Sequence, residues 1–83
     1  MDILNSSSLS NIHKIFPELT TWQLEIIILY SSGLSQSEIA KLKKISKQAV
    51  SKALNESKKR YRLEKVESIR YVFIARRLSV IPF

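Results

Sequence analysis

Five polar side chains between residues 47 and 55 are spaced so that they share one face of a helix. At 3.6 residues per turn they fall within about 140° of arc, on the side opposite Val50 and Leu54. Lysine can donate hydrogen bonds to guanine, and the carboxamides of glutamine and asparagine can pair with adenine. The pattern predicts a helix that reads base edges in the major groove of double-stranded DNA through Lys47, Gln48, Ser51, Lys52 and Asn55.

Further bases flank this face and are predicted to contact phosphates: Lys44 before it, and Lys58, Lys59 and Arg62 after it. Residues 1–40 carry one base and four acids, whereas residues 41–83 carry thirteen bases and three acids. A basic half on a chain of net charge +7 indicates an anionic partner, with nucleic acid ahead of a membrane surface. A basic face that only contacts solvent explains the charge equally well. The choice between these two interpretations therefore depends on the helices that position the basic residues.

The stretch "SQSEIAKLKKISKQAVSKAL" contains the signals of two short helices. Ser35 and Glu38 have the spacing of a capping box, and the helix that follows is expected to bury Ile39, Ala40 and Leu42.

Ala40 is small, as the close crossing of two helices requires, and Ile45 is expected to fill the corner between them. Ser46 can cap the second helix, and Val50 can pack back on the first. This spacing is typical of a helix-turn-helix.

Two more helices are predicted around this pair. Thr20 and Gln23 form a second capping box, and Gly33 stands where a left-handed helix end belongs. The last helix is expected at about 64–78, and a short helical turn around 11–16. The sequence thus predicts an all-α protein, a compact four-helix bundle containing a helix-turn-helix. It divides into a short mobile N-terminal leader, residues 1–17, and a DNA-binding domain with a C-terminal dimerisation helix, residues 18–83.

The segment "LTTWQLEIIILYSSGLSQSEIA", residues 19–40, resembles the LuxR/GerE-type DNA-binding domain. "ISKQAVSKAL" is similar to the start of its recognition helix, and equally to helices of sigma-factor region four. "ARRLSVI" is similar to the closing segment of the LuxR/GerE type. The resemblance implies four helices, a helix-turn-helix in helices two and three, and a homodimer through the last helix. A full-length chain of this size would resemble the free-standing members of the family, which lack an input domain. The chain departs from this pattern at Lys43, Lys44, Ala49 and Ala53, where an apolar residue, glycine, threonine and histidine are usual.

The last helix carries more apolar residues than one face can hold, since residues 71–75 are consecutively apolar. Ile69, Val72, Phe73 and Leu78 can cover the core. A helix that is apolar on most sides must be covered on most sides, so a second set is predicted to make the dimer contact. This set is Tyr71, Ile74, Leu78 and Val80.

Several classes of function lack support. The chain has no cysteine and one histidine, His13, without partners at metal spacing, and its serines have no nearby base. We therefore expect no catalytic site, metal, cofactor or small-molecule ligand. The longest apolar run, "IIILY", is too short to span a membrane, and no signal peptide is evident, so a cytoplasmic location is expected.

The sequence favours a sequence-specific DNA-binding transcriptional regulator that acts as a homodimer, with a recognition helix at about 47–61. The alternative is a protein-interaction module that pairs with and modulates a larger transcription regulator; RNA polymerase is a further candidate partner. A membrane-surface binder, based on "YVFIARR", ranks third.

Overall fold

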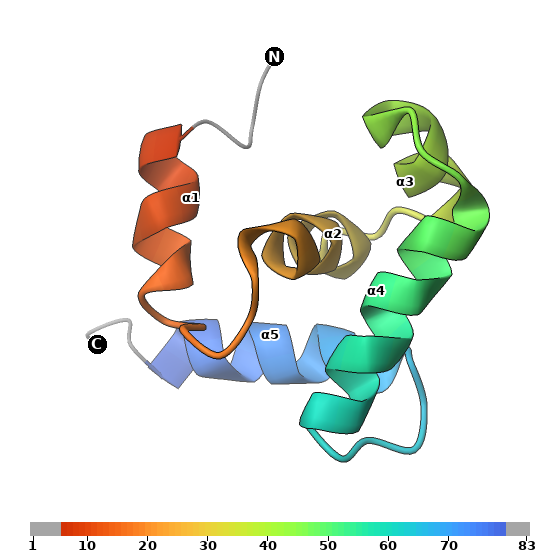
Figure 1. The fold of residues 1–83 in the computed structure, drawn as a ribbon. Helices are drawn as coiled ribbons and strands as arrows, with labels where there is room; N and C mark the ends of the chain where they lie inside the picture. The colour runs from red at the N-terminus through yellow and green to blue at the C-terminus, as the bar shows by residue number, and fades with distance from the viewer. Residues whose placement is uncertain (1–5, 80–83) are drawn as a thin grey trace.

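The computed structural model describes residues 6–79 of the chain, which fold into five α-helices and the segments that connect them (Figure 1). The all-α class and the helix-turn-helix, formed by α3 and α4, are confirmed. These residues hold one helix more than expected, because a full helix precedes Pro17 where only a helical turn around 11–16 was predicted. The helices are α1 (Ser6–His13), α2 (Thr21–Ser31), α3 (Gln36–Lys43), α4 (Lys47–Arg60) and α5 (Ser68–Ser79).

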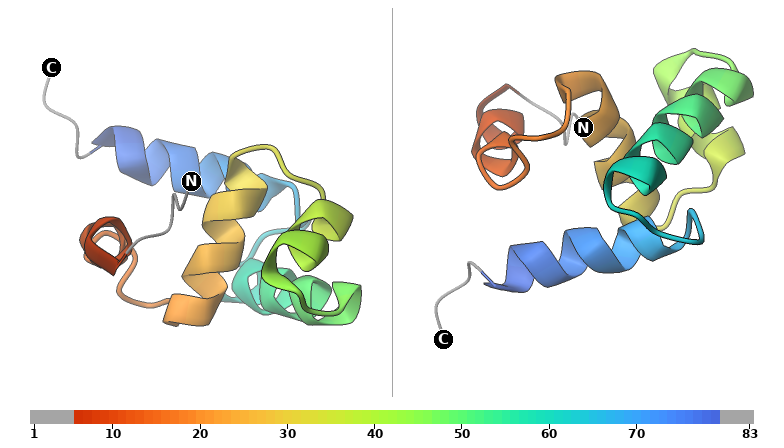
Figure 2. Two further views of the ribbon diagram at one scale, coloured as in Figure 1. Left: turned by 90° about the horizontal axis from the view of Figure 1, so that it is seen from above. Right: turned by 60° about the horizontal axis from the view of Figure 1, so that its bottom comes forward.

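Helix α2 is the centre of the domain and contacts each of the other four helices. Helix α1 lies on one side of it and the α3–α4 pair on the other, while α5 runs across them (Figure 2). Leu24 and residues 26–30 of α2 are all buried, as a helix that is apolar on every side requires. The caps make this apolar run a helix: the Gln23 amide donates to Thr20 Oγ1 at 3.1 Å, and the Thr20 amide donates to Gln23 Oε1 at 3.0 Å.

Three helices end in the same left-handed turn. Gly33, Lys44 and Arg62 have φ angles of 107°, 56° and 55°. In each case the amide of the next residue donates to a carbonyl five positions back, a Schellman pattern; these bonds are Leu34 to Leu29 (3.3 Å), Ile45 to Ala40 (3.0 Å) and Leu63 to Lys58 (3.0 Å). Only the first turn has the glycine that suits it, so Lys44 and Arg62 hold a conformation that is strained for side chains with a Cβ.

Replacing Lys44 by glycine should therefore stabilise the domain relative to replacing it by alanine. Both variants lose the same charge, and only alanine keeps the strain of positive φ, so their difference isolates the backbone. We expect Lys44→Gly to exceed Lys44→Ala by about 0.5–1 kcal/mol in the free energy of unfolding, after the greater freedom of glycine in the unfolded chain is allowed for. Urea denaturation followed by circular dichroism measures this, and equal midpoints would contradict it.

Helix α5 begins at Ser68, four residues later than expected. The chain reverses after the left-handed Arg62, and a tight turn follows in which the amides of Ser68 and Ile69 donate to the carbonyls of Lys65 and Val66 at 3.2 and 3.0 Å. Bonds that span three residues belong to a tighter turn than an α-helix. The regular helix starts only when Ile69 is buried against the core.

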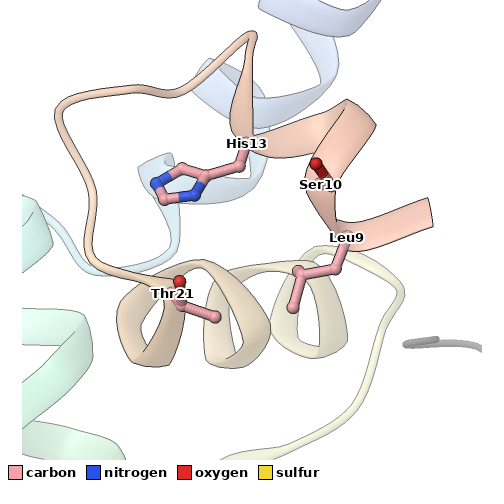
Figure 3. A pocket seen from close by; sticks show the side chains of 4 residues that line it. All are labelled: Leu9, Ser10, His13 and Thr21. Carbon is pink, nitrogen blue, oxygen red and sulfur yellow. The ribbon is translucent and has the colours of Figure 1, made fainter. Parts of the chain in front are cut away.

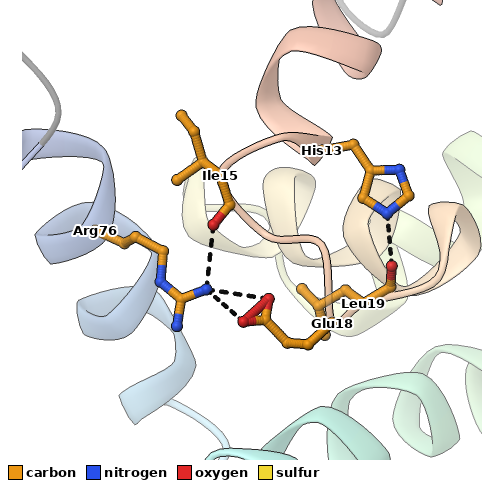
Figure 4. A network of polar contacts seen from close by, with 5 residues as sticks. All are labelled: His13, Ile15, Glu18, Leu19 and Arg76. Carbon is orange, nitrogen blue, oxygen red and sulfur yellow. Dashed lines mark hydrogen bonds and ion pairs between the residues drawn. The ribbon is translucent and has the colours of Figure 1, made fainter.

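The segment between α1 and α2 is fastened to α5. Phe16 is 1% exposed, and its ring stacks on that of Phe73 with centroids 5.2 Å apart. Arg76 Nη1 donates to the Ile15 carbonyl at 3.2 Å and to both carboxylate oxygens of Glu18 at 2.6 and 3.0 Å (Figure 4). Phe16, which the sequence analysis assigned to the leader, is thus part of the hydrophobic core.

These contacts shift the pKa values of two titratable groups, Glu18 and Tyr61. Burial alone would raise the pKa of the Glu18 carboxyl, but the hydrogen bonds and charge of Arg76 outweigh it and hold that pKa below its usual value. Tyr61, which ends α4, lies beside the same pair, and its pKa is raised to about 12 by burial and by the Glu18 carboxylate. The pair therefore remains ionised at neutral pH and joins the α1–α2 segment, α4 and α5.

Candidate nucleic-acid interface

Helix α4 has one buried face and one polar face. Val50, Ala53, Leu54 and Ser57 are buried. On the other side Lys47, Gln48 and Lys52 are exposed, while Ser51 and Asn55 are half-buried. The five side chains predicted to read bases thus lie together on the solvent side of α4.

Asn55 is less available than its position on the helix implies. Its Nδ2 donates to the Ser51 carbonyl at 2.9 Å and to Ser51 Oγ at 3.3 Å. Because pairing with adenine needs the donor and the acceptor of the carboxamide together, this internal bond competes with base contact. Gln48, which is exposed about two helical turns before Asn55, is the carboxamide better placed to pair with a base.

The first turn of α4 is fixed by its cap, since Ser46 Oγ accepts from the Ala49 amide at 3.1 Å. Beside this turn lies a shallow hollow of about 240 Å³, lined by Gln36, Lys47, Gln48 and Ser51. Gln36 belongs to α3 and was not among the predicted site residues. The cap at Ser35 does place it first in α3, but its approach to α4 depends on how the two helices cross.

The bases predicted to contact phosphates lie along α4 or at its ends. Lys44 is exposed at the corner between α3 and α4, and Lys59 and Arg62 are exposed at the far end, where Lys58 is half-buried. Lys58 and Lys59, in the last turn of α4, also stabilise that helix by interacting with the negative end of its dipole. The structure therefore spreads positive charge over the length of the helix that bears the polar face.

The Lys43 side chain pairs with an acid of α2, and the expected burial of Leu42 was wrong. Leu42 is 60% exposed. Ile39 and Lys43 are one turn apart and face inward, so the Lys43 side chain occupies the place that an apolar residue was expected to fill. Its Nζ forms an ion pair with Glu25 and lies 5.4 Å from the centroid of the Trp22 ring. Trp22 flanks the start of α2 and remains partly exposed.

Two arginines of the basic half, Arg70 and Arg76, form hydrogen bonds and an ion pair within the domain. Arg70 Nε donates to the Tyr30 carbonyl at 2.8 Å and Nη2 to the Leu34 carbonyl at 3.3 Å, near the end of α2, while Arg76 binds Glu18. The proposed membrane-binding segment "YVFIARR" thus uses one of its two arginines inside the domain. No helix among residues 6–79 has both the length and the apolar character needed to cross a bilayer.

The outer side of α5 carries an exposed apolar stripe, which we define as Tyr71, Ile74, Ala75 and Leu78. The three large side chains are 71%, 46% and 50% exposed, respectively. Their spacing is that of one helical face. Leu78, which the sequence analysis assigned both to the core and to the dimer contact, lies on the outside, and Val80 falls outside the described residues.

A second hollow lies between α1 and the start of α2, with a volume of about 340 Å³ and a lining of Leu9, Ser10, His13 and Thr21 (Figure 3). His13 Nε2 is 2.7 Å from the Leu19 carbonyl, so this histidine ties α1 to the loop that follows it. Within residues 6–79 no three side chains of histidine, cysteine, aspartate or glutamate gather as a metal site would require.

A family model for YlxM / p13-like helix-turn-helix proteins matches residues 4–73, which include α1 to α4 and the first half of α5. No curated protein and no solved structure matches the chain. The helix-turn-helix is a DNA-binding motif, so the match and the polar face of α4 agree on nucleic acid as the partner. The chain belongs to UPF0122, the family of YlxM / p13-like helix-turn-helix proteins.

Proposed function

We propose that this protein is a sequence-specific DNA-binding regulator of transcription that inserts α4 into the major groove. The observation that carries the proposal is the polar face of α4, where Lys47, Gln48 and Lys52 are exposed next to a capped first turn. No acid occurs in α4 before Glu56, so nothing on this face repels the phosphate backbone. The face combines donors for guanine with a carboxamide for adenine.

Phosphate contacts supply the remaining affinity in this proposal. Lys44, Lys58, Lys59 and Arg62 lie at the two ends of α4, where the strands that border the groove would pass. Such contacts orient a protein on the duplex without reading its sequence. They release counterions, so each one makes binding weaker as salt rises.

Selection of bound duplexes from a random pool tests the proposal. A single enriched sequence is expected, and its affinity should fall with salt at a log–log slope of about −0.9 for each phosphate contact. Failure to enrich any sequence, or a complex that is insensitive to salt, would contradict DNA reading by α4.

The finer proposal is a LuxR/GerE-type arrangement, in which the last helix joins two copies of the chain. The apolar stripe on α5 supports it, because a two-fold partner would remove this surface from water. A homodimer would present two α4 helices to half-sites about one helical turn apart, and linking the two binding events would raise the overall affinity. The selected sequence should then be a palindrome.

Replacing Ile74 by aspartate should convert the dimer into a monomer, because it places a charge in the middle of the apolar stripe. Analytical ultracentrifugation with and without the selected duplex measures the change. Asn11→Asp is the matched control, since it adds the same charge on an exposed position of α1 and should leave assembly unchanged.

A wild-type protein that stays monomeric at high concentration and on DNA would contradict the dimer. The same stripe would then favour the second candidate function, a module that pairs with a larger regulator or with RNA polymerase. A dimer that survives Ile74→Asp would place the contact on another surface of the chain.

A further inference from the structure

The hollow beside the first turn of α4 is lined by side chains from two helices. Gln36 is the first residue of α3, whereas Lys47, Gln48 and Ser51 come from the first two turns of α4. The capping box of α3 engages the neighbours of Gln36: the Ser35 amide donates to Glu38 Oε1 at 2.9 Å, and the Glu38 amide donates to Ser35 Oγ at 3.1 Å. The Gln36 carboxamide therefore takes no part in this cap.

The chemistry of the lining suits a nucleotide. Two carboxamides, one hydroxyl and one ammonium group surround the hollow, and it includes no carboxylate. Phosphate oxygens accept hydrogen bonds from amide and ammonium groups, and a second carboxamide remains to face a base edge. The hollow between α1 and α2 lacks this combination, since its lining includes no lysine, arginine or carboxamide side chain.

We propose that Gln36 is a positioning residue for base recognition: its carboxamide links a DNA phosphate to Gln48, so that one base pair is read by the two glutamines together. This inference rests on the proposed insertion of α4 into the major groove. Because a side chain that is held by a second hydrogen bond loses less freedom on binding, Gln48 should discriminate between bases better when Gln36 is present. The specificity of α4 would thus depend in part on α3.

A double-mutant cycle on the selected duplex tests the inference. Gln36→Ala is expected to weaken binding about 10-fold, an ordinary loss for one or two interfacial hydrogen bonds. Added to Gln48→Ala, it should cost no more than about 3-fold, because both substitutions disrupt the same contact. Gln36→Glu should weaken all duplexes, since it places a carboxylate beside a phosphate. Ser37→Ala, at an exposed neighbouring position in α3, is the control and should have no effect.

Base preference separates a positioning role from a purely structural one. Competing duplexes that differ at single positions should show that Gln36→Ala and Gln48→Ala relax the preference at the same base pair, with unchanged circular dichroism. Independent, multiplicative effects of the two substitutions, or an unchanged preference in Gln36→Ala, would overturn the inference. If Gln48→Ala itself has no effect on a selected duplex, the reading role of α4 fails instead, so the two failures can be distinguished.

Discussion

Alanine at Gln48 or at Lys52 is expected to weaken binding to the selected duplex by about 1–3 kcal/mol for each substitution, or roughly 5- to 150-fold. Both side chains are exposed on the polar face of α4, so their truncation leaves no cavity in the protein. The loss should therefore be one of recognition and not of folding. Each variant should also bind duplexes with other bases at one position of the site, because the side chain that favoured one base at that position has been removed.

Lys59→Ala is the matched control for this experiment. Lys59 is exposed on the last turn of α4, where it is expected to neutralise a phosphate. Its removal should weaken specific and random duplexes by the same factor and reduce the salt slope by about one contact. If Gln48→Ala and Lys52→Ala behave in the same way as Lys59→Ala, α4 binds the backbone without reading the sequence.

The helix-turn-helix could be predicted from the sequence because its signals are local. Ser35 with Glu38, and Thr20 with Gln23, form the capping boxes that their spacing indicates, and Ser46 caps α4. Capping depends on residues three positions apart, so no knowledge of the tertiary structure is needed. The polar face of α4 follows from the same logic, since helical periodicity fixes which side chains oppose Val50.

What could not be predicted depends on contacts between distant parts of the chain. The pairing of Lys43 with Glu25 joins residues 18 positions apart, and that of Arg76 with Glu18 joins residues 58 apart. Two glutamates of the acidic half are thus paired with bases of the basic half, which the distribution of charge along the sequence does not reveal. Gln36 was missed for a similar reason, because its place beside Gln48 is set by the crossing of α3 and α4.

Replacing Phe16 by alanine is expected to reduce the free energy of unfolding by about 3–5 kcal/mol, the usual cost of removing a buried phenylalanine side chain. The ring is 1% exposed and is covered by Phe73, and the guanidinium carbon of Arg76 lies 4.8 Å from its centroid. Its removal would leave a cavity between the α1–α2 segment and α5. Small domains have little stability to spare, so a substantial fraction of the variant should be unfolded at 37 °C.

Tyr71→Ala provides the control, because it also removes an aromatic ring but from a side chain that is 71% exposed. Measured at a concentration that keeps the chain monomeric, it should change the free energy of unfolding by less than about 0.5 kcal/mol. Phe16→Leu should fall between the two, since leucine refills part of the cavity but cannot stack on Phe73. A loss of less than about 1 kcal/mol in Phe16→Ala would contradict the contribution of residue 16 to the core. It would support the division predicted from the sequence, in which residues 1–17 are a mobile leader and the folded domain begins at residue 18.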